Sequence, residues 1–341
     1  MSVTLADVAR RAGVSMKTVS RVINNEERVA DATREKVMAA IHDLGYVPNV
    51  WAQRLARGHS GLIGLLMYDA TPAYIMNVMN GLMDIGDQTG YRISLYRLNV
   101  HDPQEVERVI GFAAQRRVEA FVFTPPCDNA TTLVRALQEL KFPFVQLTPH
   151  ERCSTCAWVS SSDESGSYQA ACHLIELGHT RIAFIKGNQD HVASRDRLQG
   201  YKRALADHGL AVDESLLQQG DWEFETGLDC ARVLLDLPEP PTAIMAANDD
   251  TAAGIMQAAW ERGLTCPDDL SVIGYDDVPL ARQVTPPLTT VRQPIYDIAT
   301  TAMSMLVEKL IPGLATETAV EVPSQFIQRH STGPLKRVVQ N

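Results

Sequence analysis

The stretch TLADVARRAGVSMKTVSRVIN, residues 4–24, decides how the N-terminal end of this chain folds. Its first half predicts a short helix, because four apolar residues recur with the spacing of one helix face: Leu5, Val8, Ala9 and Ala12. Thr4 and Asp7 have the spacing of a capping box at the start of that helix, and Gly13 ends it.

A second helix follows after a three-residue turn, with Ser15 placed to cap it. Its inward face carries Val19, Val22 and Ile23, and its outer face carries Met16, Lys17, Ser20, Arg21 and Asn24. Two short helices joined by a turn that contains glycine form a helix-turn-helix. Lys17 and Arg21 lie one turn apart, where a helix in the major groove of DNA needs hydrogen-bond donors.

A third helix is predicted to begin with Asp31 as its cap and to stop at Gly45, before Pro48. Its apolar face carries Val37, Ala40, Ile41 and Leu44. Three small helices then enclose one small core. Any short three-helix unit shows such a pattern, so the basic outer face of the second helix is the feature that favours DNA binding.

The charge of the chain is unevenly distributed. The whole sequence carries a formal net charge of −10 at pH 7. Residues 1–60 hold nine Lys or Arg against six Asp or Glu, a net charge of +3, whereas the remainder holds 22 against 35, a net charge of −13. This segregation is typical of a small polyanion-binding head on an acidic body.

Length and composition set the broad class of protein. A chain of 341 residues exceeds the usual size of one domain, so we expect a small domain with a larger one, or three compact units. Apolar residues make up 45% and charged residues 21%, which is ordinary for a globular protein. No apolar run approaches the roughly 18 residues of a membrane span, and no export signal begins the chain. We therefore expect a cytoplasmic protein that does not bind membranes.

The cysteines favour no particular chemistry. Cys153 and Cys156 form a lone C-x-x-C, with no second pair and no histidine couple to complete a zinc site. Reduced thiols in a cytoplasmic core are the favoured interpretation, and metal or redox use is the alternative. Neither a metal nor a cofactor is expected.

From Gly61 onward, short apolar runs alternate with segments of helix length. The predicted strands form one set at residues 62–66, 93–96, 120–123 and 144–147, and a second set, beginning near Ser160, at 181–185, 243–247 and 270–274. This alternation predicts an α/β core of doubly wound parallel sheets with helices on both faces, and two sets predict two lobes. Ligands of such folds bind at the carboxyl ends of the strands, in the crevice between the lobes.

Polar residues follow several of these strands. Residues 248–250 (Asn-Asp-Asp) follow one strand, residues 275–277 (Tyr-Asp-Asp) follow another, and Arg197 lies in a passage from loop to helix. Carboxylates, an amide and a guanidinium suit a polyhydroxylated ligand, since each hydroxyl needs donor and acceptor partners. Trp222 and Tyr74 are placed to stack on a ring. A sugar is the favoured ligand.

Several of these residues have a structural alternative. Asp249 and Asp277 are alternatively helix caps, and Trp222 is alternatively a core residue. Arg197 and Asp276 are the stronger candidates, because a buried charge without a partner or a ligand is expensive.

The N-terminal motifs together resemble a known family. The runs TLADVA (4–9), AGVS (12–15), TVSRV (18–22), TREKV (33–37) and LGYVPN (44–49) are similar to the headpiece of the lactose repressor/galactose repressor (LacI/GalR) family. The resemblance implies double-stranded operator DNA as a partner. Lys17 and Arg21, with Met16 beside them, are then expected to read base edges, and Thr4, Ser15 and Ser20 to contact phosphates. The full set of expected DNA contacts is Thr4, Ser15, Met16, Lys17, Thr18, Ser20, Arg21, Asn24 and Leu55.

The segment from Asn49 to Gly58 resembles the hinge helix of that family, which forms on the operator and inserts a leucine into the minor groove. Leu55 occupies that position, although an ordinary apolar linker residue is the alternative. A helix this short is marginal in water, so it is expected to order only on DNA beside a partner hinge. Trp51 departs from the smaller residue common at its position, which puts close pairing of two hinges in doubt.

The resemblance extends over essentially the whole chain and includes the blocks at 194–200, 247–249, 271–277 and 286–293. It implies a periplasmic-binding-protein-like core of two lobes. The chain is then expected to cross between the lobes three times, near Ser161, Thr290 and Pro323. The implied organisation is a headpiece at 1–47, a hinge at 48–59, a core at 60–332 and a tail at 333–341. The N-lobe then takes about 60–160 with 291–321, and the C-lobe about 162–289 with 323–332. The expected effector contacts are Arg197, Trp222, Asn248 and Asp276, with Tyr68, Asp69, Tyr74, Thr148 and Ser161 as weaker candidates.

The resulting expectation is a repressor of carbohydrate-utilisation genes that a small sugar-like effector releases. The chain ends at Asn341 without a heptad-patterned tail, so a homodimer on a palindromic operator is expected. An enzyme is one alternative, but no nucleophile motif, phosphate loop or metal-ligand set appears. A periplasmic sugar-binding protein is another, but it would need an export signal and has no use for Lys17 and Arg21.

Overall fold

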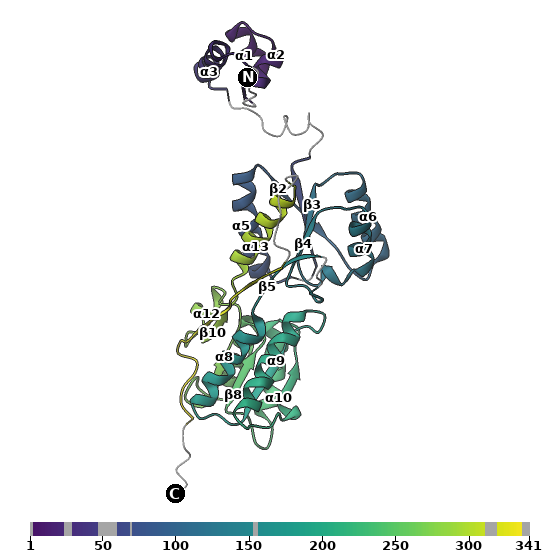
Figure 1. Cartoon of the computed structure of the whole chain (residues 1–341). Helices are drawn as coiled ribbons and strands as arrows, with labels where there is room; N and C mark the ends of the chain where they lie inside the picture. The colour runs from purple at the N-terminus through teal and green to yellow at the C-terminus, as the bar shows by residue number, and fades with distance from the viewer. Residues whose placement is uncertain are drawn as a thin grey trace. The chain divides into compact units, whose positions relative to one another are not determined.

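The computed structural model describes residues 3–23, 29–46, 60–68, 70–152, 156–310 and 319–335. Contacts within the chain divide it into two compact units, Met1–Gly61 and Leu62–Asn341. Figure 1 shows short helices in the first unit and helices packed on sheets in the second. Among the described residues, no helix combines the length and the apolar character needed to cross a lipid bilayer.

The first unit contains the three predicted helices, α1 (Leu5–Ala12), α2 (Met16–Ile23) and α3 (Asp31–Leu44). They pack around a small core that comprises Val8, Ala9, Val19, Val22, Val37 and Ala40. The capping box of Thr4 and Asp7 is confirmed, and Gly13 ends α1 in a left-handed conformation with φ 68°. The Ser15 hydroxyl oxygen accepts a hydrogen bond from the backbone N–H of Thr18 at 3.1 Å, which confirms it as the cap of α2.

The predicted cap of α3 is wrong by one residue. Ala30 is the N-cap, in an extended conformation and without a side-chain hydrogen bond, and Asp31 is the first residue of the helix itself. In the first turn, the negative charge of Asp31 still interacts favourably with the helix dipole. Gly45 ends α3 as predicted, with φ 60°.

The second unit begins with a sheet of six parallel strands in the order β11-β5-β4-β3-β1-β2. The strands are β1 (Leu62–Met67), β2 (Arg92–Arg97), β3 (Ala120–Phe123), β4 (Phe144–Leu147), β5 (Ala157–Ser161) and β11 (Ala319–Val322). The helical segments of this lobe are α5 (Pro72–Thr89), α6 (Pro103–Ala114), η1 (Cys127–Asn129), α7 (Thr131–Glu139) and α13 (Ile295–Leu310). One buried cluster joins the sheet to α5 and α13, and another joins its other face to α6 and α7. All four strands of the first predicted set are confirmed.

A second sheet has four parallel strands in the order β7-β6-β8-β9. The strands are β6 (Ile182–Lys186), β7 (Leu217–Gln219), β8 (Ala243–Ala246) and β9 (Ser271–Ile273). The helical segments are α8 (Asp163–Glu176), α9 (Val192–Asp207), η2 (Glu214–Leu216), α10 (Phe224–Leu235), α11 (Asp249–Glu261) and α12 (Leu280–Gln283). Two further buried clusters line the two faces of this sheet. The predicted doubly wound α/β class is therefore confirmed.

Three segments connect the two sheets. The chain leaves the first sheet at the end of β5 and enters α8, and it returns through β10 (Thr290–Arg292) to α13. After β11 it passes to β12 (Gln325–Ile327), which pairs antiparallel with β10. These connecting segments lie side by side where the lobes meet, so any change in the angle between the lobes must act on them.

We predict that Gly200→Ala destabilises the second unit, because α9 packs very closely on α8. A Cβ atom on Gly200 would lie 2.1 Å from the backbone oxygen of Glu164. The free energy of unfolding should fall by about 3 kcal/mol in urea denaturation. In the control Gly111→Ala, on α6, the new Cβ meets nothing within 4 Å, so stability should rise by up to about 1 kcal/mol. Equal effects of the two substitutions would contradict this packing.

Candidate functional site

The exposed face of α2 is the candidate DNA-contacting surface of the first unit. Met16 is 55% exposed, and Lys17 and Arg21 are exposed as well. The opposite face buries Val19 and Val22 in the core of the unit. This division leaves a helix that presents two basic side chains and one long apolar side chain outward, as sequence periodicity predicts.

Other predicted DNA contacts also form hydrogen bonds that stabilise the starts of the helices. The Thr4 hydroxyl donates to the Asp7 carboxylate at 2.6 Å. The hydroxyl oxygens of Ser15 and Thr18 lie 2.9 Å apart in a hydrogen bond, which fixes the first turn of α2. Ser20 is half-buried. Asn24 and Leu55 lie outside the described residues, as do the hinge segment and Trp51.

The second unit contains a pocket between its two sheets. One side is formed by Ala70, Thr71, Tyr74, Pro125 and Thr148, and the other by His191, Ala193, Arg197, Trp222, Asn248 and Asp276, with Gln293 from a connecting segment. Thr148 follows β4 and Asn248 follows β8, so the pocket lies at carboxyl ends of strands in both sheets. This is the usual location of ligand sites in parallel α/β folds.

Six of the predicted effector contacts line this pocket: Tyr74, Thr148, Arg197, Trp222, Asn248 and Asp276. Tyr68 does not; it packs on a buried cluster of the first lobe, with the Arg97 guanidinium 5.8 Å from its ring centroid. Ser161 is fully buried behind the pocket. Asp69 lies outside the described residues.

Sequence reasoning missed the other lining residues. Thr71 caps α5, and its side chain accepts from the backbone N–H of Tyr74 at 3.4 Å. The T-P that precedes this helix was a readable signal, since threonine before an N1 proline is a common helix start. His191 and Gln293 carry no comparable signal, because their place in the pocket depends on how the lobes meet.

Arg197 is the buried centre of the site, with a side chain that is 4% exposed. Its Nε donates to Asp163 Oδ1 at 2.9 Å, and its Nη2 donates to Asp276 Oδ1 at 3.2 Å. Its Nη1 donates to the backbone oxygen of Ala247. The guanidinium also lies 3.6 Å from the centroid of the Tyr275 ring, within the range of a cation–π contact.

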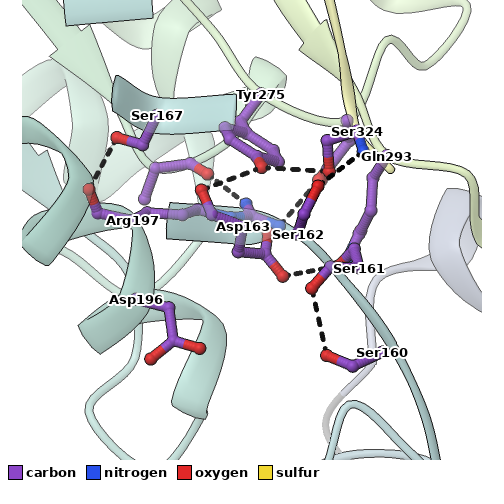
Figure 2. A network of polar contacts seen from close by, with 12 residues as sticks. Ser160, Ser161, Ser162, Asp163, Ser167, Asp196, Arg197, Tyr275, Gln293 and Ser324 are labelled. Carbon is purple, nitrogen blue, oxygen red and sulfur yellow. Dashed lines mark hydrogen bonds and ion pairs between the residues drawn. The ribbon is translucent and has the colours of Figure 1, made fainter. Parts of the chain in front are cut away.

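Asp163 was not predicted, and it links Arg197 to the connecting segments (Figure 2). Its carboxylate also accepts a short hydrogen bond from the Ser161 hydroxyl, which in turn accepts from Gln293 Nε2 at 3.0 Å. The Tyr275 hydroxyl donates to the backbone oxygen of Asp163 at 3.3 Å. Residues from α8, from the loop after β9 and from the segment after β10 therefore form one polar network.

Asn248 is largely occupied by structural hydrogen bonds. Its Oδ1 accepts from the backbone N–H of Thr251 and so caps α11, and its Nδ2 donates to the backbone oxygen of Trp222 at 2.8 Å. Its second amide N–H has no acceptor among the described residues. By contrast, the indole Nε1 of Trp222 is buried in the pocket and has no hydrogen-bond partner within the part of the chain that the structure describes.

Three residues of the pocket have a left-handed backbone. Thr148 has φ 46°, Trp222 has φ 79° and Asp276 has φ 106°. Such conformations cost roughly 1–3 kcal/mol each in residues other than glycine, and they concentrate at functional sites. The buried indole N–H of Trp222, which has no partner among the described residues, also indicates a ligand-binding site.

Burial raises the pKa of Asp276 to about 7, against the opposing effect of the Arg197 guanidinium. Its Oδ1 accepts from Arg197, whereas its Oδ2 accepts no hydrogen bond from any described residue. Asp276 therefore has an acceptor atom for a ligand and a charge that changes near neutral pH.

The neighbouring acids have structural roles. Asp249, which is 1% exposed, accepts from the Thr290 hydroxyl at 2.6 Å and from the backbone N–H of Val278 at 2.9 Å. Asp277 is not a helix cap; its fully buried carboxylate is bound by Arg282, Arg292 and Arg329. Among the described residues, no group of His, Cys, Asp or Glu is arranged to hold a metal ion.

Both units of the chain match models of known protein families. Residues 4–49 match the model "Bacterial regulatory proteins, lacI family", and residues 171–332 match "Periplasmic binding protein-like domain". The chain is 34% identical over 338 residues to the HTH-type transcriptional regulator DegA of Bacillus subtilis. The alignment covers 98% of this chain and 99% of that protein.

Solved structures agree with this match. The Lac repressor dimer bound to operator and the anti-inducer ONPF aligns with a TM-score of 0.81 at 30% identity, over 98% of this chain and 100% of that one. The complex of the transcriptional regulator CelR with cellobiose aligns with a TM-score of 0.73 at 30% identity, over 96% of this chain and 99% of that one.

We predict that Asp277→Asn destabilises the second unit by about 3 kcal/mol at pH 7, because three arginines lose a buried partner. Burial raises the pKa of Asp277, but the hydrogen bonds of Arg329 and Arg292 outweigh burial and hold that pKa below its ordinary value. The stabilisation is therefore present above about pH 4 and is lost as the pH falls further. Urea unfolding at several pH values measures it.

The matched control is Asp229→Asn, which removes a carboxylate 3.0 Å from Arg232 in a pair whose aspartate is 75% exposed. Such surface pairs contribute little, so the control should change stability by less than about 1 kcal/mol. A loss at Asp277 no larger than the loss at Asp229 would show that the arginine cluster does not stabilise the fold.

Proposed function

Because this chain belongs to the lacI family of bacterial regulatory proteins, we propose that it represses carbohydrate-utilisation genes and that a small sugar releases it from DNA. The similar proteins are transcription regulators and not enzymes, and this chain is a DNA-binding transcription regulator. The regulated genes, the sugar and the direction of the response are the proposed parts.

The observation that carries the proposal is the make-up of the pocket. Arg197, Trp222 and Asp276 contribute from the second lobe, and Tyr74 and Thr148 from the first. A ligand held by both lobes favours one angle between them, whereas a ligand with equal affinity for two angles would shift nothing. The same chain carries a helix-turn-helix, so a change in the angle between the lobes can affect a DNA-binding unit.

The lining residues suit a sugar. Tyr74 and Trp222 provide aromatic surface, and the carboxylate, amide and hydroxyl groups provide the mixed donors and acceptors that ring hydroxyls need. The similar CelR structure is described as a cellobiose complex. We propose Tyr74, Thr148, Arg197, Trp222, Asn248 and Asp276 as the effector contacts, directly or through the network around Arg197.

Apolar side chains on the surface of the second unit support a homodimer. Met76 and Met83 on α5 are exposed beside Leu95 on the edge strand β2, and Trp260 on α11 is 72% exposed. Large exposed apolar side chains on adjoining elements, as on α5 and β2, are typical of subunit interfaces. A twofold dimer presents two headpieces, which fits a palindromic operator.

We propose the following organisation: a headpiece at 1–47, a hinge at 48–59 with Leu55 in the minor groove, a two-lobed core at 60–332 and a tail at 333–341. In this arrangement the lobe angle sets the spacing of the two hinges. Effector affinity and operator affinity are then reciprocally coupled, by about 1–3 kcal/mol in typical switches.

We predict that Arg21→Ala weakens binding to the specific operator by roughly 1–3 kcal/mol and changes affinity for random DNA little, because the side chain reads a base edge. Fluorescence anisotropy at fixed salt measures both affinities. Lys36→Ala is the matched control, since it removes one exposed positive charge from α3 of the same unit. Equal losses on both DNAs would make Arg21 a phosphate contact instead.

We predict that Asp276→Asn weakens the response to the effector and leaves operator binding near normal without effector. In the native chain, effector affinity should fall as the pH is lowered from 8 to 6, by up to tenfold per unit below about pH 7, because protonation removes the acceptor charge of Asp276. The variant should lose this pH dependence. Titration of operator affinity against effector concentration at each pH measures both effects.

A full native response in Asp276→Asn would make this residue structural. Loss of operator binding by the effector-free variant would mean that Asp276 holds the fold.

A further inference from the structure

We propose that Asp163 determines the charge class of the effector: by neutralising Arg197 it makes the pocket accept an uncharged ligand and reject phosphate or carboxylate groups. The inference deepens the proposed function and rests on the pocket being the effector site. Asp163 is in this sense a specificity-determining residue, although it does not line the pocket and acts through Arg197.

The first support is that Arg197 has no nitrogen left without an acceptor. Nε donates to Asp163, Nη2 donates to Asp276, and Nη1 donates to the backbone oxygen of Ala247. Arginine recognises phosphate and carboxylate through two parallel N–H groups on one edge of its plane. Three of its five N–H groups are therefore already bound by the protein, two of them by carboxylates. One face of the guanidinium is covered as well, by the Tyr275 ring, whose centroid lies at 3.6 Å.

The second support is the charge balance of the site. Arg197 is the one Lys or Arg among the described lining residues, and it faces two carboxylates, those of Asp163 and Asp276. With both carboxylates ionised, which for Asp276 requires a pH above about 7, the three groups carry a net charge of −1. Burial is the main cause that raises the pKa of the Tyr74 hydroxyl on the opposite wall of the pocket, and the charges of Asp276 and Asp163 act in the same direction. An anion placed between these walls would be repelled, and weak screening in a buried site strengthens that effect.

The third support is that Asp163 cannot easily turn away from Arg197. It is 1% exposed, its second oxygen accepts from Ser161, and Ser161 is held by Gln293 at 3.0 Å. Figure 2 shows these side chains gathered where the connecting segments pass between the lobes. The neutralising carboxylate is therefore fixed by Ser161, which is fully buried, and through Ser161 by Gln293, which lines the pocket from a connecting segment.

The groups that remain for a ligand are those an uncharged hydroxylated molecule can use. Asp276 Oδ2 is an acceptor, the buried Nε1 of Trp222 is a donor without a partner, and Thr71 and Thr148 each provide a hydroxyl. A sugar hydroxyl donates to the first and accepts from the second. A phosphate offers mostly acceptor oxygens, and it would add its own negative charge beside the carboxylate of Asp276.

The test compares the thermal unfolding of the full chain in sodium phosphate and in sodium chloride of equal ionic strength. The variants are Asp163→Asn, Arg197→Gln and the double substitution. The native chain and Arg197→Gln should show the same response to phosphate, because Arg197 does not bind it. Asp163→Asn should gain a phosphate-specific rise of roughly 3 °C, as expected for a millimolar site, and the double substitution should lose it.

The inference is overturned if phosphate raises the melting temperature of the native chain and Arg197→Gln abolishes that rise. It is equally overturned if a folded Asp163→Asn gains no phosphate response. Circular dichroism establishes that each variant folds. Should Asp163→Asn not fold, Asp276→Asn takes its place, since it removes the other carboxylate on Arg197 and should gain a smaller phosphate response.

A second measurement uses the native chain alone, with ribose against ribose 5-phosphate and glucose against glucose 6-phosphate. A phosphate ester that stabilises the chain more than its parent sugar would also overturn the inference. Failure of the proposed function has a different signature: no sugar would change operator affinity, whereas the phosphate responses of the variants would be as expected.

Discussion

The buried positive charge of Arg197 is the constraint on which the core of this protein depends. A guanidinium that is 4% exposed must be compensated, because a charge removed from water without partners costs several kcal/mol. Its compensation comes from three separate places: Asp163 at the start of α8, the backbone after β8 at Ala247, and Asp276 after β9. One charge thus fixes the relative positions of the start of α8 and of the chain after β8 and after β9.

The same charge joins the pocket to the segments that pass between the lobes. Asp163 follows the first connection directly, and through Ser161 it reaches Gln293 in the second. The Tyr275 ring covers Arg197, and its hydroxyl lies 3.5 Å from that of Ser324 in the third. A ligand that moves Asp276 therefore acts on a network that already includes every connection between the two sheets. This is the physical basis on which occupation of the pocket can change the lobe angle.

The sequence predicted what depends on local periodicity and missed what depends on the meeting of distant segments. Helices of the headpiece and long apolar strands follow from spacing alone, and Arg197 and Asp276 follow from charge at the ends of predicted elements. Asp163 escaped prediction because its partner lies 34 residues away and its own neighbourhood is a run of serines. Strands β7, β10 and β12 have three residues each and include polar side chains, whereas the equally short β9 lies in an apolar run and was predicted. Asp31 was misplaced by one position because its role at a helix start is compatible with either place.

The adjacent residues Asp276 and Asp277 give one turn two roles, one in the pocket and one in the stability of the fold. Both residues have a positive φ, 106° and 56°, and their carboxylates bind different partners. Asp276 lies in the pocket against Arg197, whereas Asp277 is buried among arginines that include Arg292 of β10 and Arg329 beyond β12. Because adjacent residues share a backbone, a ligand that moves the backbone at Asp276 also acts on the contacts of Asp277. The strained turn is therefore held in place by the arginine cluster, and the connecting strands are held to the pocket by the same cluster.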